Sequence, residues 1–382
     1  MRAEQNNKKI KIAVDALAIS KDSAGSFVVL VGLIKELIKL SDIDFVLYVT
    51  KPDIERTIGG RERLEYVYAP KWAKIFFGRL LWQQFILPIL VKKAGCSLLY
   101  SASGYPEIFT KLPVVTHQQN LWSFEPPQQW WSVKNIIKSF LRRQVAKIAI
   151  LTSDANIFIS EYLRDIANLS IPKSAQKNFT VVNAISSKHF NFDNIPKGEY
   201  SAKEYCLAVG SLVVHKNYLA LIHAFRFVAN ECPALEMIIV GNFTNKYGNK
   251  VRKLCKKLKL DKKVIFTGGI DFEKVISLYH QAKFSVNVSL LEGFGLPVLE
   301  SMASACPVVC SDIPVFHEIG GESVLYCNPT NAEDIAKKMI YLYKDEKKRK
   351  ILSMAGLERS KSFSWCQSAV KMIDVFKFAM GG

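Results

Sequence analysis

Long apolar runs are absent from this sequence of 382 residues. A membrane-spanning helix needs about 18–20 consecutive apolar residues, and the longest candidates, Phe27–Ile34 and Phe85–Val91, are much shorter. The first residues, Met1–Lys11, are polar and basic and lack an apolar core with a cleavage site, so we expect no signal peptide. These absences predict a cytoplasmic protein, with peripheral attachment to the inner face of a membrane left open.

Clustered metal ligands are also absent. None of the eight cysteines forms a CxxC pair, and Cys306 and Cys310 have no second ligand pair nearby. Because zinc is held by about four well-placed side chains, we predict no metal site. Reduced, buried thiols are the expected state of these cysteines.

Acidic residues are scarce relative to basic ones. The chain has 52 Lys and Arg against 34 Asp and Glu, which leaves a formal net charge of +18. An excess of this size favours anionic partners, and nucleic acid, anionic lipid and phosphorylated substrates all qualify. A solvated basic surface without a specific partner is the alternative.

Strand and helix patterns alternate along the chain. Ile10–Leu17 reads as a buried strand, Ser20–Ser26 as a loop, Phe27–Leu40 as a helix and Asp44–Thr50 as a second strand. This alternation predicts parallel sheets covered by helices. A dinucleotide-binding dehydrogenase is excluded, because the loop after the first strand lacks Gly-x-Gly-x-x-Gly.

The same pattern repeats in both halves of the chain, on either side of a polar, turn-rich stretch. We predict two Rossmann-like, doubly wound α/β domains that face a central cleft, at residues 1–190 and 191–363. A C-terminal helix at 364–382 is expected to cross back to the first domain. Ligands are expected at the carboxyl ends of the strands.

The most informative segment follows the predicted strand Phe284–Val288. A glycine-containing turn leads into a helix that begins near Pro297, and a helix start with free N–H groups is a site for anions such as a diphosphate. Glu292 and Glu300 flank this turn. Since carboxylates repel phosphates, we interpret them as acceptors for sugar hydroxyls. The alternative is that Glu300 complements the helix dipole and that Glu292 is merely solvated.

The run Glu292–Glu300, Glu-Gly-Phe-Gly-Leu-Pro-Val-Leu-Glu, resembles the signature of the family 4 retaining glycosyltransferases, which have the GT-B fold. The resemblance continues through Pro307–Val309, Asp312 and Glu318. It implies that Glu292 lies at the donor sugar and that Glu300 holds the ribose hydroxyls. The backbone of Phe294, Gly295 and Leu296 would then meet sugar hydroxyls and phosphate.

Four further segments resemble landmarks of this family. Lys216 matches a lysine that neutralises the departing diphosphate, although His215 stands where an arginine is frequent. His117, at a predicted strand end, matches a histidine that reaches the donor sugar. The remaining donor-binding residues implied by the resemblance are Ser211, Gly269, Ile270 and Gly25.

The resemblance implies a retaining, metal-independent transfer of a hexose from a GDP- or UDP-linked donor, with mannose favoured, in cell-surface polysaccharide synthesis. No cofactor is expected. The segment Asp42–Asp44 resembles a divalent-ion motif, but it precedes an early strand, so we interpret it as a solvated turn. The alternatives are another GT-B enzyme, a phosphorylase or epimerase, or a basic nucleic-acid-binding protein, for which no motif is found.

Two segments mix cations with aromatic residues. These are Lys71–Trp82, and Trp130 and Trp131 followed by Lys134, Lys138, Arg142 and Arg143. Such surfaces suit the headgroup region of an anionic membrane, so we predict a glycan or lipid-linked acceptor of lipopolysaccharide type, and no nucleic acid. The alternative places these aromatic side chains in the core.

Overall fold

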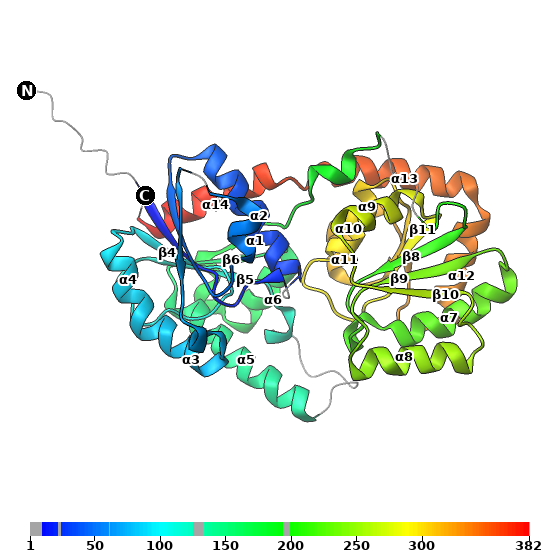
Figure 1. Ribbon diagram of the computed structural model, residues 1–382, viewed down its shortest axis with the longest axis horizontal. Helices are drawn as coiled ribbons and strands as arrows, with labels where there is room; N and C mark the ends of the chain where they lie inside the picture. The colour runs from blue at the N-terminus through cyan, green and yellow to red at the C-terminus, as the bar shows by residue number, and fades with distance from the viewer. Residues whose placement is uncertain (1–9, 22–23, 61, 125–132, 194–198, 382) are drawn as a thin grey trace, which may run out of the picture. The chain divides into compact units, whose positions relative to one another are not determined.

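The computed structural model describes residues 10–21, 24–60, 62–124, 133–193 and 199–381. The chain forms two compact units, one of Met1–Ala184 with Ser364–Gly382 and one of Ile185–Phe363 (Figure 1). The sequence-based boundary after residue 190 falls at the end of a 3-10 turn, η6 (Ser187–Phe190), in the second unit.

The first unit is built on a parallel sheet of seven strands in the order β3-β2-β1-β4-β5-β6-β7. The central strands are apolar on both faces, as expected for a parallel sheet covered on each side. From β1 to β3 successive strands are added on one side of β1, and from β4 to β7 they are added on its other side. The sheet therefore has a topological switch point between β1 and β4. The strands are β1 (Lys11–Asp15), β2 (Asp44–Val49), β3 (Leu64–Tyr68), β4 (Leu98–Ser101), β5 (Val114–Gln118), β6 (Ala155–Phe158) and β7 (Asn178–Thr180).

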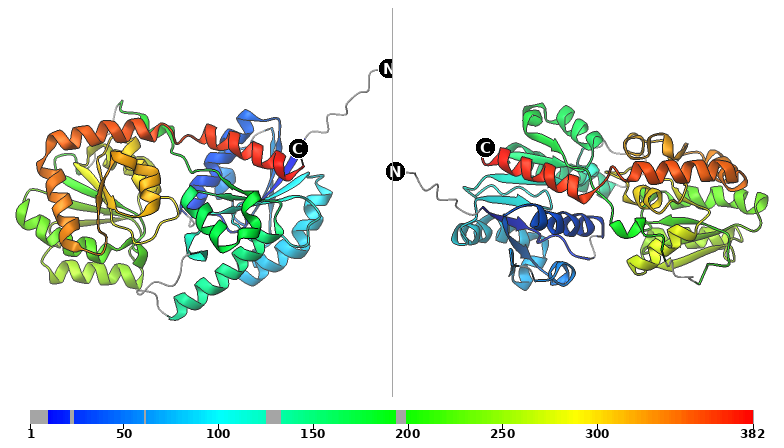
Figure 2. Two further views of the ribbon diagram at one scale, coloured as in Figure 1. Left: turned by 180° about the vertical axis from the view of Figure 1, so that it is seen from behind. Right: turned by 90° about the horizontal axis from the view of Figure 1, so that it is seen from above.

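Helices cover both faces of this sheet. On one face, α1 (Ala24–Leu40) packs along the C-terminal helix α14 (Trp365–Ala379), so residues far apart in sequence share one core (Figure 2). The other face is covered by α4 and the helices around it. The remaining helices and turns are α2 (Asp53–Ile58), η2 (Lys71–Lys74), α3 (Phe76–Leu81), η3 (Trp82–Ile86), α4 (Leu87–Lys93), η4 (Leu121–Ser123), α5 (Val133–Thr152), α6 (Glu161–Ser170) and η5 (Pro172–Lys177).

The second unit has a parallel sheet of six strands in the order β10-β9-β8-β11-β12-β13. Its switch point lies between β8 and β11, which pair directly. The strands are β8 (Tyr205–Val209), β9 (Glu236–Val240), β10 (Val264–Gly268), β11 (Phe284–Asn287), β12 (Val308–Ser311) and β13 (Leu325–Cys327).

The helices of the second unit follow the strands in alternation. Their apolar sides enclose a core that includes Phe225, Phe284 and Met339. The two parallel, helix-covered sheets confirm the predicted pair of Rossmann-like folds. The helices and turns are η7 (Val214–Lys216), α7 (Tyr218–Glu231), α8 (Lys246–Lys257), α9 (Phe272–Gln281), α10 (Leu296–Ala303), α11 (Pro314–Gly320), η8 (Gly321–Ser323), α12 (Ala332–Lys344) and α13 (Glu346–Ser360).

Two local predictions were wrong. The loop expected at Ser20–Ser26 is shorter, because α1 begins at Ala24 and Gly25 therefore lies in its first turn. The helix after the glycine turn begins at Leu296, so Pro297 is its second residue; a proline there still costs no hydrogen bond within the helix. Of the helices in the described ranges, none is long and apolar enough to cross a membrane.

Candidate functional site

The candidate site lies at the carboxyl ends of β8 and β11, the switch point of the second sheet. After β8 the chain forms the short turn η7, and after β11 it runs through residues 288–295 into α10. The N–H of Leu290 donates to the carbonyl of His215 at 2.7 Å, which ties these two loops together. The predicted residues Lys216 and Glu292 are therefore brought side by side from positions 76 apart in sequence.

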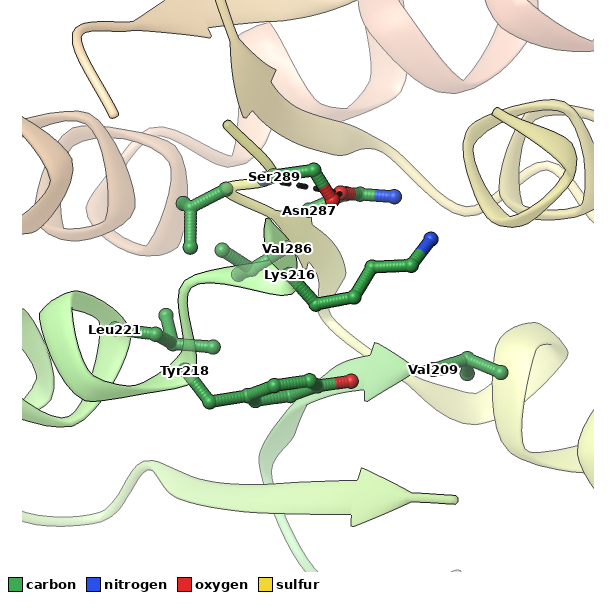
Figure 3. Close-up of a pocket in the computed structure, with 8 residues that line it drawn as sticks. Val209, Lys216, Tyr218, Leu221, Val286, Asn287 and Ser289 are labelled. Atoms are coloured by element: carbon green, nitrogen blue, oxygen red, sulfur yellow. Dashed lines mark hydrogen bonds between the residues drawn. The ribbon is translucent and has the colours of Figure 1, made fainter. Parts of the chain in front are cut away.

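Lys216 and Glu292 form an ion pair between Nζ and Oε1. The two side chains are only 17% and 11% exposed, so water screens their attraction less than it screens a surface pair. Ser289 Oγ lies 2.7 Å from Asn287 Oδ1 (Figure 3). It also lies 2.8 Å from the Glu292 oxygen that pairs with Lys216, and its one proton can be donated to only one of these two oxygens at a time. An ammonium has three N–H donors, so Lys216 can hold Glu292 and still contact an anion.

The two residues that follow Lys216 are held by hydrogen bonds to other loops. Asn217 adopts the left-handed conformation with φ of 59°, which asparagine tolerates, and its amide donates to the carbonyl of Pro329 at 2.7 Å. The Tyr218 hydroxyl donates to the carbonyl of Gly210 at 2.9 Å. Lys216 and Tyr218 thus border one small pocket at the strand ends (Figure 3). Its other lining residues are Val209, Leu221, Val286, Asn287, Val288 and Ser289.

The turn that starts α10 depends on Gly295, which has φ of 106°. A Cβ atom added there would lie 2.5 Å from Cε1 of Phe316, a fully buried ring on α11, so only glycine fits. The N–H of Leu296, the first residue of α10, has no carbonyl partner within that helix. Pro297 lacks an N–H, and the N–H groups of Val298 and Leu299 donate to the carbonyl of Gly295. The dipole of α10 is positive at this end. The Phe294 side chain packs edge-on against Phe363 in the core, so a ligand could use only the backbone of Phe294.

Glu300 lies on the second turn of α10 and is held by Tyr279 from α9, whose hydroxyl donates to Oε2 at 3.3 Å. Burial raises the pKa of Glu300 from 4.5 to about 7, although Tyr279 and the nearby Lys216 charge oppose this. The carboxyl group is therefore divided between its neutral and ionised forms near neutral pH.

This raised pKa predicts pH-dependent donor binding. If Glu300 accepts hydrogen bonds from ribose hydroxyls, its ionised form binds best, and that form grows as pH rises through about 7. We expect the affinity for a nucleotide sugar to rise roughly tenfold from pH 6 to pH 8. Isothermal titration would measure it, with Glu300→Gln showing a flat profile. If the wild-type protein has equal affinities at both pH values, the proposed role of Glu300 in donor binding is wrong.

The other predicted donor-binding residues lie at the same edge of the second sheet or in the first unit. Ser211 is exposed in the loop after β8. Gly269 is exposed and Ile270 partly buried, just after β10. Gly25 belongs to the first unit, in α1.

His117 lies in β5 of the first unit and is 1% exposed. Its Nδ1 is 2.6 Å from the hydroxyl of Tyr100, and its Nε2 is buried without a hydrogen-bond partner. Burial lowers the pKa of His117 to about 3, so the ring is neutral at physiological pH. A neutral imidazole ring can donate a hydrogen bond to a hydroxyl from one nitrogen or accept one at the other, but it carries no positive charge.

A buried carboxyl pair occurs at the switch point of the first sheet, and sequence reasoning did not find it. Asp15 ends β1 and accepts from the N–H of Leu17 at 3.0 Å and from Gln83. Burial and the neighbouring Asp15 charge raise the pKa of Glu107 well above its usual value. Burial also raises the pKa of Asp15. Both effects favour the protonated form of Glu107, in which two buried negative charges are not in contact.

Sequence reasoning also missed the residues that hold the second-unit site in shape. Asn287 and Ser289 could have been found, because polar residues at the end of a buried strand point to a site at that edge. Tyr279 and Phe316 carried no such signal, since each looks like an ordinary apolar position of a helix. Their roles depend on contacts with α10 that only the fold creates.

The cysteines contribute no reactive group to this site. Seven of the eight are buried and Cys366 is exposed. Burial raises the pKa of Cys306 to about 12, so this thiol stays protonated. Across the described residues, no three His, Cys, Asp or Glu side chains are grouped so as to hold a metal ion.

Known proteins resemble this chain in sequence and in fold. The family of group 1 glycosyl transferases matches residues 190–359. The chain is 31% identical over 198 residues to the O-antigen chain mannosyltransferase RfbU of Salmonella typhimurium, covering 51% of this chain and 52% of that protein. It is 26% identical over 183 residues to the O-antigen chain mannosyltransferase B of Escherichia coli, covering 48% of each. The chain thus matches about half the length of these relatives.

A solved structure extends the likeness to the whole fold. A glycosyltransferase from Rickettsia africae superposes with a TM-score of 0.76 over 98% of this chain and 99% of that chain, at 16% identity. The sequence-based resemblance to polysaccharide mannosyltransferase-like glycosyltransferases is confirmed by these matches. Residues 190–359, which contain Lys216, Glu292 and the start of α10, match the group 1 glycosyl transferases, and the chain as a whole has the GT-B fold.

Proposed function

We propose that this chain transfers a hexose, mannose in the first instance, from a nucleotide diphosphate sugar to a glycan or lipid-linked acceptor in cell-surface polysaccharide synthesis. The observation that carries the proposal is the Lys216–Glu292 pair beside the start of α10. It supplies a cation, the N–H of Leu296 and the positive end of α10 for a diphosphate, together with a carboxylate for sugar hydroxyls. The two O-antigen mannosyltransferases among the relatives support the choice of sugar and pathway.

The proposed reaction is a retaining, front-face substitution at the anomeric carbon. The bond from the anomeric carbon to the diphosphate oxygen breaks, and the acceptor oxygen bonds to the same face of that carbon. The acceptor proton passes to the departing phosphate oxygen, so no protein nucleophile is needed. Lys216 and the start of α10 stabilise the charge on the diphosphate, while Glu292 orients the sugar.

The proposed chemistry needs no cofactor and no metal ion. Lys216 and the positive end of α10 take the place that a divalent cation has beside a leaving diphosphate. Glu300, with Tyr279 behind it, receives the ribose hydroxyls. Ser211, Gly269 and Ile270 border the nucleotide, and His117 and Gly25 are the proposed contributions of the first unit.

A donor screen tests this function. GDP-mannose, UDP-glucose and related donors would be compared by thermal shift and by product analysis, with EDTA present. We expect one donor to stabilise the protein and to transfer its sugar with retained configuration. Activity that returns only with an added divalent ion would refute the metal-independent mechanism. Stabilisation by RNA or DNA but by no nucleotide sugar would refute the transferase proposal.

We further propose that the enzyme works as a peripheral protein on the inner, anionic face of a membrane, where a lipid-linked acceptor is presented. The net charge of +18 supports this proposal. The side chains of Trp130, Trp131, Lys134 and Lys138 lie outside the described residues, so that part of the prediction stays a prediction.

A further inference from the structure

The helices α3, η3 and α4 form one continuous helical segment, Phe76–Lys93, with two contrasting sides. One side is buried against the first sheet and includes Trp82, Leu87 and Val91, each at most 2% exposed. The other side exposes large apolar side chains at every fourth position. They are Phe77 (74% exposed), Leu81 (56%), Phe85 (57%) and Ile89 (56%).

The π turn in the middle of this helical segment helps to keep the four exposed apolar side chains on one side of it. An α-helix has 3.6 residues per turn, so side chains spaced by four drift steadily around its axis. Residues Trp82–Ile86 form a π turn, which takes more residues per turn and so works against that drift. Pro88, which lacks an N–H, lies two residues beyond this turn, and a helix distorts at such a position because a hydrogen bond is missing.

The loop after β4 adds to the same exposed strip. The buried Gln84 fixes this loop, because its amide donates to the carbonyl of Pro106 at 2.6 Å and accepts from the N–H of Ile108 at 3.1 Å. Phe109 then stacks on Phe85, with ring centroids 5.4 Å apart. Ile108 and Phe109 are 49% and 59% exposed. We call the six residues Phe77, Leu81, Phe85, Ile89, Ile108 and Phe109 the apolar ridge.

The charge around the apolar ridge is of one sign. From residue 66 to residue 106 the sequence contains no Asp or Glu. The Arg79 guanidinium lies 5.3 Å from the ring centre of Tyr105, in the loop that leads to Ile108 and Phe109. The cations of the stretch are Lys71, Lys74, Arg79, Lys92 and Lys93.

Helix α5 carries the same combination on the same face of the sheet. Asn156 donates to the carbonyl of Ile150 at 3.1 Å, which places α5 on the side opposite to α1 and α14. Its residues Ile137, Phe140 and Leu141 are between 56% and 60% exposed. The stretch 126–153 has no acidic residue, and its exposed cations within the described part include Arg142, Arg143 and Lys147.

We propose that the apolar ridge inserts into the headgroup layer of an anionic lipid bilayer and docks the first unit on it. The stretch 66–106 has cations and no acid, and Glu107, which precedes Ile108, is buried. Apolar side chains with cations nearby match a membrane, whose headgroup layer is negative and whose interior is apolar. A second copy of the chain would be a poor partner, because a two-fold symmetric contact brings the same cations of both copies close together, and they repel. The inference deepens the proposed function and rests on it for the location of the acceptor.

Vesicle co-sedimentation tests the inference with the full chain. The vesicles contain phosphatidylcholine alone or mixed with phosphatidylglycerol. We expect the wild-type protein to bind the anionic vesicles and the double variant Phe77→Ser/Phe85→Ser to have a bound-to-free ratio at least about tenfold lower. The matched control is Ile351→Ser/Met354→Ser, at exposed positions of α13 in the second unit, which should bind like the wild type.

Further outcomes separate the ridge from its alternatives. Wild-type binding by the ridge variant, at both low and moderate salt, would overturn the proposal. The proposal would also be overturned if the wild-type protein is a dimer and the ridge variant is a monomer that still binds vesicles normally. That result would show that the ridge contacts a second copy of the chain rather than a membrane. Thermal unfolding of the variant should match the wild type, since the replaced side chains are exposed.

Donor binding without vesicles distinguishes this inference from the proposed function. A ridge variant that binds its nucleotide sugar normally but loses vesicle binding supports both. A wild-type protein that binds vesicles through the ridge but binds no nucleotide sugar would refute the proposed function alone. A wild-type protein that binds the donor but no anionic vesicle would refute the ridge alone.

Discussion

Replacing Lys216 by alanine is expected to lower sugar transfer by more than about 100-fold. The reason is that Lys216 is the cation at the proposed diphosphate site, and charge on that diphosphate grows as the bond to the sugar breaks. Steady-state kinetics with the donor found in the screen would measure the loss. A larger fall in kcat than rise in KM would place the effect in the transition state.

A surface lysine provides the matched control. Lys283 pairs with Glu204 at 2.8 Å in the same unit, and both side chains are considerably more exposed than the site pair. Lys283→Ala should transfer sugar at the wild-type rate. If Lys216→Ala transfers sugar at nearly the wild-type rate, Lys216 does not take part in the reaction.

Glu292 is expected to act together with Lys216. Glu292→Gln should also lower transfer by more than about 100-fold, and the double variant should lose less than the product of the two single losses. The coupling is expected because each single change leaves the other group in a mostly buried site without its partner. Independent, multiplying losses would show that the ion pair has no part in catalysis.

Replacing Gly295 by alanine is expected to destabilise the second unit. The left-handed φ of 106° costs a non-glycine residue about 1–2 kcal/mol, and the contact with buried Phe316 adds about 1–3 kcal/mol. We therefore expect the free energy of unfolding to fall by about 2–5 kcal/mol. Urea unfolding followed by circular dichroism would measure it.

The same change should also weaken donor binding, because Gly295 sets the direction of the first N–H groups of α10. Gly60→Ala is the control, since an added Cβ atom there has no neighbour within 4 Å. It should leave both the unfolding free energy and donor affinity unchanged. A Gly295→Ala protein of wild-type stability would show that Phe316 yields easily and that the turn is not constrained as described.

The alternation of apolar runs and turn residues was enough to predict two parallel sheets. In such sheets each central strand is buried on both faces, so it appears in sequence as a short apolar run such as Ile12–Val14. The donor motif was also visible, because a strand, a glycine turn and a proline-started helix are neighbours in sequence. Its backbone geometry follows from local residues, apart from the contact of Gly295 with Phe316.

The sequence by itself thus determined the fold class, the donor segment and the residues Lys216, Glu292 and Glu300 as candidates. The tertiary structure alone decided that Lys216 and Glu292 form a pair, because strand order places β8 beside β11. It also decided that burial beside Tyr279 raises the pKa of Glu300 to about 7, and that Phe77 and Phe85 are exposed whereas Trp82 is buried. Burial and long-range pairing depend on how elements pack, and a local pattern of residues does not contain that information.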